Sequence, residues 1–129
     1  MTIEIQMLAW AIALGLAHVL VAAALMTQQR GLKWNTGARD GEARPLTGVA
    51  ARMDRGLRNF LETVPFFAAA VLAVTLTERT SDDTALGVQI YFWARLAYVP
   101  IYALGIPYLR TLVWAVSLYG LLQVVVALF

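Results

Sequence analysis

The chain has 129 residues, of which 60% are hydrophobic and only 14% charged, and its mean hydropathy is +0.68. Soluble domains are usually about 45–50% apolar, so this composition indicates an integral membrane protein. The formal net charge of +2 is too small to indicate a nucleic-acid-binding protein. There is no cysteine, which excludes a disulfide framework and a thiolate nucleophile, and one histidine cannot build a metal site alone.

Four apolar stretches come close to the ~20 residues that a helix needs to cross a bilayer. They cover approximately residues 5–26, 49–76, 85–104 and 108–129. Only Gln6 and His18 interrupt the first stretch, which we interpret as a retained helix rather than a cleaved signal peptide. No internal repeat divides the chain. The sequence therefore predicts one all-α domain, residues 1–129, built as a membrane-spanning four-helix bundle.

The connections between these stretches predict the topology. Residues 27–48 are polar and rich in glycine, as expected of one long loop, and residues 78–83 form a short acidic turn. A tight turn follows at residues 105–107, with Pro107 suited to the first turn of the fourth helix. Short connections make sequential helices antiparallel neighbours, so we expect up-down topology.

The basic residues predict the orientation. Those near one side of the membrane are Arg30, Lys33, Arg39, Arg44, Arg52, Arg55, Arg58 and Arg110. The other side has only Arg79, beside three carboxylates. The positive-inside rule then places loop 27–48 in the cytoplasm and both termini outside. The compact length and the lack of a eukaryotic retention signal favour a bacterial inner membrane.

A polar stripe runs along the start of the second span. Arg55, Asn59 and Glu62 fall at i, i+4 and i+7, so they share one helical face. Lipid does not tolerate such a face, which must therefore look at protein, water or a ligand. Asp54 and Arg58 are four residues apart on another face, where they can form an ion pair.

The third span carries a second polar stripe, with Arg95, Tyr98 and Tyr102 at i, i+3 and i+7. An unpaired arginine at the centre of a span costs about 2.5–3.5 kcal/mol. Glu62 is the one carboxylate at a matching depth, so we expect it to be the partner of Arg95. Arg110 follows at the cytosolic start of the fourth helix.

Together these residues carry a family resemblance. The order Arg55-x3-Asn59-x2-Glu62-x2-Pro65, then Arg95-x2-Tyr98-x3-Tyr102, then Arg110, resembles the MAPEG superfamily, the membrane-associated proteins in eicosanoid and glutathione metabolism. That superfamily includes microsomal glutathione transferases and the leukotriene and prostaglandin E synthases. The similarity covers nearly the whole chain.

The resemblance implies a homotrimer that holds glutathione, as a co-substrate, in clefts between neighbouring subunits. The side chains that it implies hold glutathione are Arg55, Asn59, Glu62, Arg95, Tyr98 and Tyr102. Arg110 matches the arginine that stabilises the glutathione thiolate in catalytic members. The implied function is a membrane-bound, glutathione transferase-like enzyme that conjugates or reduces an apolar electrophile in detoxification. No metal is implied.

The residue chemistry agrees with this expectation. Glutathione has two carboxylates, which arginine binds as a planar fork, and one ammonium group, which suits Glu62. Asn59 can bond the peptide groups. A thiol with a pKa near 8.5 is mostly protonated at neutral pH, and a guanidinium beside it favours the thiolate. The thiolate could then attack an electrophile arriving from the bilayer.

Plainer interpretations of the same residues stay open. Glu62 and Arg95 could be a purely structural ion pair, Tyr98 and Tyr102 could be packing aromatics, and Arg110 could be a topology anchor. His18 is expected to be a packed, hydrogen-bonded side chain without a function.

Two other function classes compete with this one. A small drug–proton antiporter would need a carboxylate within the first span, and residues 5–26 contain none. A non-catalytic lipid-binding or scaffold member of the same family would have the fold without glutathione turnover, and it is the alternative function.

Overall fold

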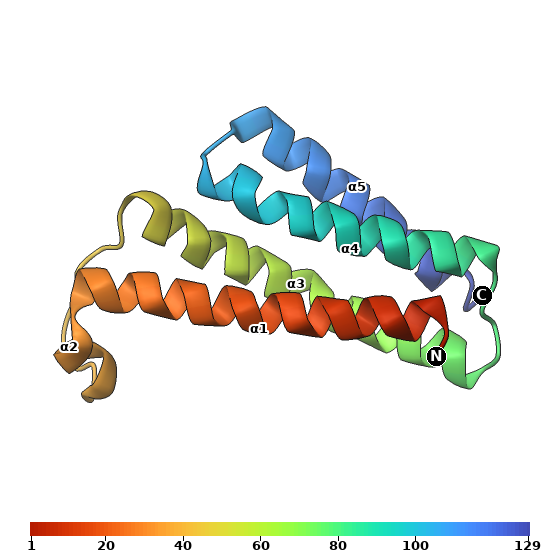
Figure 1. Cartoon of the computed structure of the whole chain (residues 1–129), viewed down its shortest axis with the longest axis horizontal. Helices are drawn as coiled ribbons and strands as arrows, with labels where there is room; N and C mark the ends of the chain where they lie inside the picture. The colour runs from red at the N-terminus through yellow and green to blue at the C-terminus, as the bar shows by residue number, and fades with distance from the viewer.

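The computed structural model describes residues 1–129, all in helices and their connections, and so confirms the all-α prediction. The helices are α1 (Ile3–Arg30), α2 (Leu32–Thr36), α3 (Gly48–Leu76), α4 (Asp82–Ala103) and α5 (Pro107–Val126). The four long helices run alternately in opposite directions, and α2 is a single short turn beside the end of α1 (Figure 1).

The long helices associate as two pairs. Helix α1 packs along α3, and α4 packs closely along α5. The pairs meet through α1 with α4 and through α3 with both α4 and α5, whereas α1 and α5 do not approach each other. The closed four-helix bundle that the sequence predicts is therefore not established by the single chain.

Apolar side chains from all four long helices form the core. The buried cluster consists of Met7, Leu8, Ala11, Phe67, Ala70, Val71, Val74, Val88, Tyr91, Phe92, Leu121 and Val124. Phe67 on α3 stacks on Tyr91 on α4, with their ring centroids 4.0 Å apart. The Tyr91 hydroxyl lies 2.9 Å from the Thr63 hydroxyl, so the aromatic pair also satisfies its polar atom.

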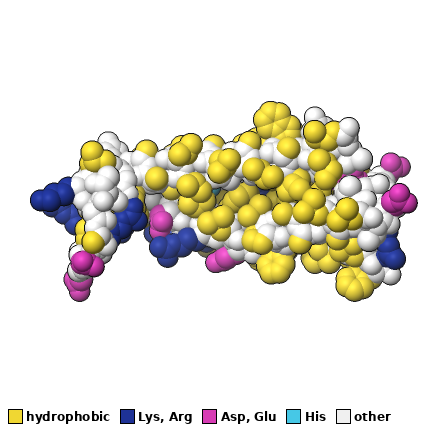
Figure 2. Space-filling model, turned by 90° about the horizontal axis from the view of Figure 1, so that it is seen from below, with side chains coloured by type: hydrophobic (Ala, Val, Ile, Leu, Met, Phe, Trp, Pro, Cys, Tyr) yellow, Lys and Arg dark blue, Asp and Glu magenta, His cyan; other side chains and the backbone are white.

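Three helices, α1, α3 and α5, are long and apolar enough to cross a membrane. Hydrophobic side chains fill the middle of the face in Figure 2, while charged side chains gather mainly toward its two ends, as in a protein that crosses a bilayer. Helix α4 is not among the three, and its apolar stretch contains Gln89 and Arg95. The expected third span, residues 85–104, thus stays a prediction.

The expected loop over residues 27–48 is only partly a loop. Helix α1 continues to Arg30, because Gln28, Gln29 and Arg30 are good helix formers. It ends at Gly31, whose φ of 91° suits glycine. Helix α2 then occupies Leu32–Thr36, between two glycines.

Side-chain hydrogen bonds close the rest of this connection. The Gln29 amide donates to the Thr47 carbonyl at 2.9 Å, and the Thr47 N–H donates back to Gln29 Oε1 at 3.0 Å. Arg30 Nε donates to the Arg44 carbonyl at 2.8 Å. The start of α3 is therefore fixed directly to the end of α1.

The acidic turn is also shorter than predicted. Ser81 caps α4 in a capping box with Thr84, so Asp82 and Asp83 belong to the first turn of the helix. There the positive end of the helix dipole stabilises both carboxylates. Pro107 begins α5, as the sequence predicts.

Candidate functional site

Arg95 on α4 is the most deeply buried cation in the chain, with only 1% of its surface exposed. Its Nη1 donates to Asn59 Oδ1 on α3 at 2.8 Å. Its guanidinium carbon lies 4.4 Å from the Tyr98 ring centroid and 5.5 Å from that of Phe60. Arg95 therefore points into the protein rather than toward lipid, as expected.

The expected ion pair between Arg95 and Glu62 is wrong. The one ion pair in the chain joins Arg58 to Asp54 at 3.2 Å, the pair expected from their spacing. Glu62 is exposed on the surface of the single chain. The physical reason is helical register: Asn59 lies nearly one turn earlier on α3 and meets Arg95 first, leaving Glu62 without a cation.

The contact with Arg95 fixes the orientation of the Asn59 amide. Because Oδ1 accepts from the guanidinium, the amide nitrogen is the end of Asn59 left for another group. Two nitrogens of Arg95, Nε and Nη2, are buried without a hydrogen-bond partner. Asn59 is thus held as an oriented donor.

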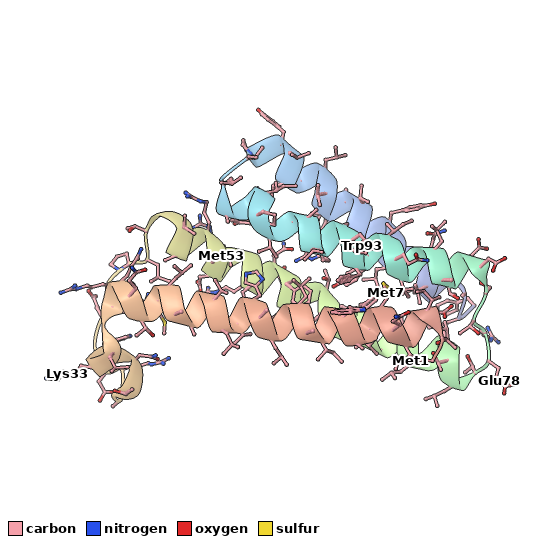
Figure 3. The ribbon with its side chains drawn as sticks, in the orientation of Figure 1. Met1, Met7, Lys33, Met53, Glu78 and Trp93 are labelled. Atoms are coloured by element: carbon pink, nitrogen blue, oxygen red, sulfur yellow. The ribbon has the colours of Figure 1, made fainter.

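A cleft of about 400 Å³ opens where α3 meets the turn between α4 and α5. Three arginines line it: Arg52 and Arg55 from α3, and Arg110 from α5. Tyr102 lines it from α4, and no carboxylate does. Met53, the neighbour of Arg52, lies in the half of the molecule nearer Lys33 than Glu78 (Figure 3). The cleft is therefore a strongly cationic cavity in the half of the molecule that contains Lys33.

Tyr102 holds the cleft together. Arg55 Nε donates to its hydroxyl oxygen at 3.2 Å. The guanidinium carbon of Arg110 lies 5.0 Å from its ring centroid, within cation–π range. Because the hydroxyl oxygen accepts from Arg55, its own hydrogen is free to donate to another group. Two cations and one hydroxyl donor thus converge on one wall.

The sequence-predicted residues fall into two groups. The structure brings Arg55, Tyr102 and Arg110 together at the cleft. The four that do not line the cleft are Asn59, Glu62, Arg95 and Tyr98. Tyr98 is as buried as Arg95, with 1% of its surface exposed, and the two are in contact. These two side chains lie in the interior, where Arg95 also donates to Asn59.

Arg52 is a cleft residue that the sequence interpretation assigned to topology alone. Its Nε donates to the Ala103 carbonyl at 2.8 Å, which turns the side chain across the cleft toward the end of α4. The signal was its spacing, since position 52 lies three residues before Arg55 on the same stripe.

Two further buried polar side chains complete the interior. His18 on α1 lies 3.0 Å from the Met53 carbonyl through Nε2, which confirms the expected packed, hydrogen-bonded histidine. Glu4, in the first turn of α1, accepts a 2.6 Å hydrogen bond from the Thr84 hydroxyl. The sequence interpretation missed this carboxylate because it began the first helix at residue 5. No group of three or more metal-ligating side chains is present.

Chemically, the cleft suits an anionic ligand. Arginine binds carboxylates through two parallel N–H donors, and three such groups lie around one cavity. None of the three forms an ion pair within the chain. Bound carboxylates or a thiolate would therefore meet guanidinium groups whose charge no carboxylate of the chain neutralises.

Comparison with known proteins gives one match. Neither curated proteins nor solved structures yield a match to this chain. The family model described as the MAPEG family matches residues 7–129, essentially the whole chain. This match spans both polar stripes, the cleft and Arg110. The chain therefore belongs to the MAPEG family.

Proposed function

We propose that this protein is a membrane-bound glutathione transferase-like enzyme, which conjugates an apolar electrophile with a thiolate stabilised by Arg110. Membership of the MAPEG family supports a glutathione-related membrane function. The observation that carries the proposal is the cleft lined by three unpaired arginines around Tyr102. A co-substrate with two carboxylates and a thiol is the ligand that such a cleft favours.

The length of the polar stripe also fits glutathione. Arg55 and Glu62 are seven residues apart on α3, which corresponds to about 10.5 Å along the helix. Three extended residues of an ordinary peptide reach about 10–11 Å, and the γ-linked glutamate makes glutathione slightly longer. Arg55 would take a carboxylate at one end, Glu62 the ammonium at the other, and the Asn59 amide nitrogen a carbonyl oxygen between them. The order of Arg55, Asn59 and Glu62 along α3 thus matches the order of carboxylate, peptide carbonyl and ammonium along glutathione.

In this assignment Arg110 is the catalytic residue. The thiol proton passes to water, and the guanidinium stabilises the thiolate that remains. The sulfur lone pair forms a bond to the electrophilic carbon, and the displaced bond pair leaves with the leaving group or, in an addition, takes a proton from water. Arg52 and Arg55 hold carboxylates. Arg95 and Tyr98 act as positioning residues, because both are buried, Arg95 donates to Asn59, and its guanidinium packs on the Tyr98 ring.

We also propose that the site is completed by a second subunit in a homotrimer. Arg55 and Glu62 are both exposed on the single chain. Glu62 lies in the middle of α3, a membrane-length helix, where contact with lipid would be costly. A neighbouring subunit would cover this face and enclose the ligand.

Calorimetric titration of glutathione into the detergent-purified protein tests binding, and an ultraviolet absorbance scan of the complex tests thiolate formation. A conjugation assay with a generic aromatic electrophile then tests turnover. Binding with a thiolate signal and turnover supports the transferase. Binding without turnover with any electrophile supports the non-catalytic alternative, and absence of binding contradicts both the glutathione assignment and its residues.

A further inference from the structure

A second basic cleft lies at the C-terminal end of α1. It shares no lining residue with the cleft around Tyr102. It has a volume of about 500 Å³. Arg30, Lys33 and Arg39 line it, together with Trp34 and one acidic residue, Asp40. None of these charged groups forms an ion pair, not even with Asp40. No carboxylate of the chain therefore neutralises the three positive charges, although Arg30 and Arg39 each donate to a backbone carbonyl.

The depth of this cleft follows from the length of α1. Its 28 residues extend about 42 Å, whereas the hydrocarbon core of a bilayer is about 30 Å thick. The last turn, from Thr27 to Arg30, is polar and must lie in the headgroup layer if the apolar part fills the core. Helix α2 follows at once, and Lys33 marks this end of the molecule in Figure 3.

The cleft is also held in shape. Asn35 donates to the Thr27 hydroxyl at 2.7 Å, which ties α2 back to the end of α1. Arg39 donates to the Asn35 carbonyl through Nε at 3.2 Å and through Nη2 at 3.0 Å. The cations thus project from a folded segment rather than from an extended loop.

Apolar side chains beside the cations indicate an amphiphilic ligand. Trp34 forms part of the cleft wall, and Leu32, which precedes Lys33 on α2 but does not line the cleft, has 67% of its surface exposed. A tryptophan at headgroup depth next to basic residues is typical of a lipid contact. We infer that this cleft binds the headgroup of an anionic phospholipid, with its phosphate among Arg30, Lys33 and Arg39.

The test uses the full-length protein, delipidated in a neutral detergent. Phosphatidylglycerol or phosphatidylcholine is titrated in, and retained lipid is counted by native mass spectrometry. The variants are Lys33→Gln and the double variant Lys33→Gln with Arg39→Gln. The native Lys33 side chain makes no hydrogen bond within the chain, so its replacement leaves no partner unsatisfied. Arg58→Gln is the matched control, because it removes one positive charge outside both clefts.

Phosphatidylglycerol should be retained at least tenfold more tightly than phosphatidylcholine. The preference should fall about fivefold in Lys33→Gln and more than tenfold in the double variant, since each basic residue near a surface contributes about fivefold. Arg58→Gln should stay within twofold of the unmodified protein. An unchanged preference in the double variant, or an equal loss in Arg58→Gln, overturns the inference. If glycerol phosphate, which has no acyl chains, bound equally well, the ligand would be a free phosphate compound and the lipid assignment would be wrong.

Discussion

At the scale of single residues, Arg110 stands at a position that its own helix does not favour. It lies in the first turns of α5, which begins at Pro107, where the positive end of the helix dipole disfavours a cation. Its guanidinium carbon lies 5.0 Å from the centroid of the Tyr102 ring, and both side chains line the cleft. A thiol beside it would therefore feel both the guanidinium and the helix dipole.

We predict that Arg110→Ala separates binding from chemistry. Glutathione affinity should stay within several-fold, because Arg55, Asn59 and Glu62 remain, while the conjugation rate at pH 7 falls tenfold or more. Without the cation the pKa of the bound thiol rises, so the thiolate and the rate are recovered only at higher pH. A pH profile of kcat measures this shift, with Arg58→Ala as the control. Unchanged turnover would make Arg110 a topology anchor.

A second residue-scale prediction concerns the orientation of Asn59. Asn59→Asp keeps an oxygen for Arg95 Nη1 but replaces the outward donor with an acceptor. We expect a thermal midpoint close to that of the unmodified protein and a loss of glutathione affinity of tenfold or more. Calorimetry and a thermal scan of the same sample measure the two effects.

Asn59→Leu supplies the comparison. It removes the hydrogen-bond partner of a guanidinium that is 1% exposed, and a hydrogen bond to a charged group contributes about 1.5–3 kcal/mol. This variant should therefore lose stability as well as affinity. Full affinity in Asn59→Asp would contradict the assignment of its amide nitrogen to the ligand.

At the scale of elements, α4 and α5 meet through two glycines. A Cβ atom on Gly120 would lie 2.6 Å from the Gly87 carbonyl oxygen and 2.7 Å from the Tyr91 backbone nitrogen. Backbone atoms in helices cannot move aside as a flexible side chain can. Gly87 and Gly120 therefore set how closely these two helices approach.

We predict that Gly120→Ala destabilises the protein by about 1–3 kcal/mol or more, the usual cost of overpacking. Gly56→Ala is the matched control in another long helix, because its Cβ would meet no atom outside its own helix backbone closer than 3.5 Å. That change should be neutral, or stabilising by about 0.5–1 kcal/mol. Thermal unfolding followed by circular dichroism compares the two variants, and equal midpoints would contradict the packing argument.

Much of this arrangement could be predicted from periodicity. The stripe of Arg55, Asn59 and Glu62 and the inward Arg95 follow from helical spacing and from the cost of charge in lipid. The partner of Arg95 could not be predicted, because it depends on the axial offset between α3 and α4. The short α2 and the hydrogen bonds between Gln29 and Thr47 were missed for a similar reason, since long-range contacts leave no local pattern.

At the scale of the whole molecule, the exposed polar face predicts assembly. Arg55 and Glu62 are both exposed on α3 of the single chain, on a helix otherwise apolar enough to cross a membrane. We expect native mass spectrometry from a mild detergent to detect trimers, because a neighbouring subunit would remove this face from lipid. Spectra with only monomers or dimers would contradict the homotrimer and leave the site open on one side.

The glycine contact between α4 and α5 has a mechanical consequence for ligand binding. Because α4 and α5 touch backbone to backbone, we expect little movement between them and more at their boundary with α1 and α3. The arginine cleft spans this boundary, with Arg52 and Arg55 on one helix pair and Tyr102 and Arg110 on the other. A bound tripeptide would contact both helix pairs and so restrict their relative motion. Occupancy should then slow backbone amide exchange along α3, many residues from any atom that touches the ligand.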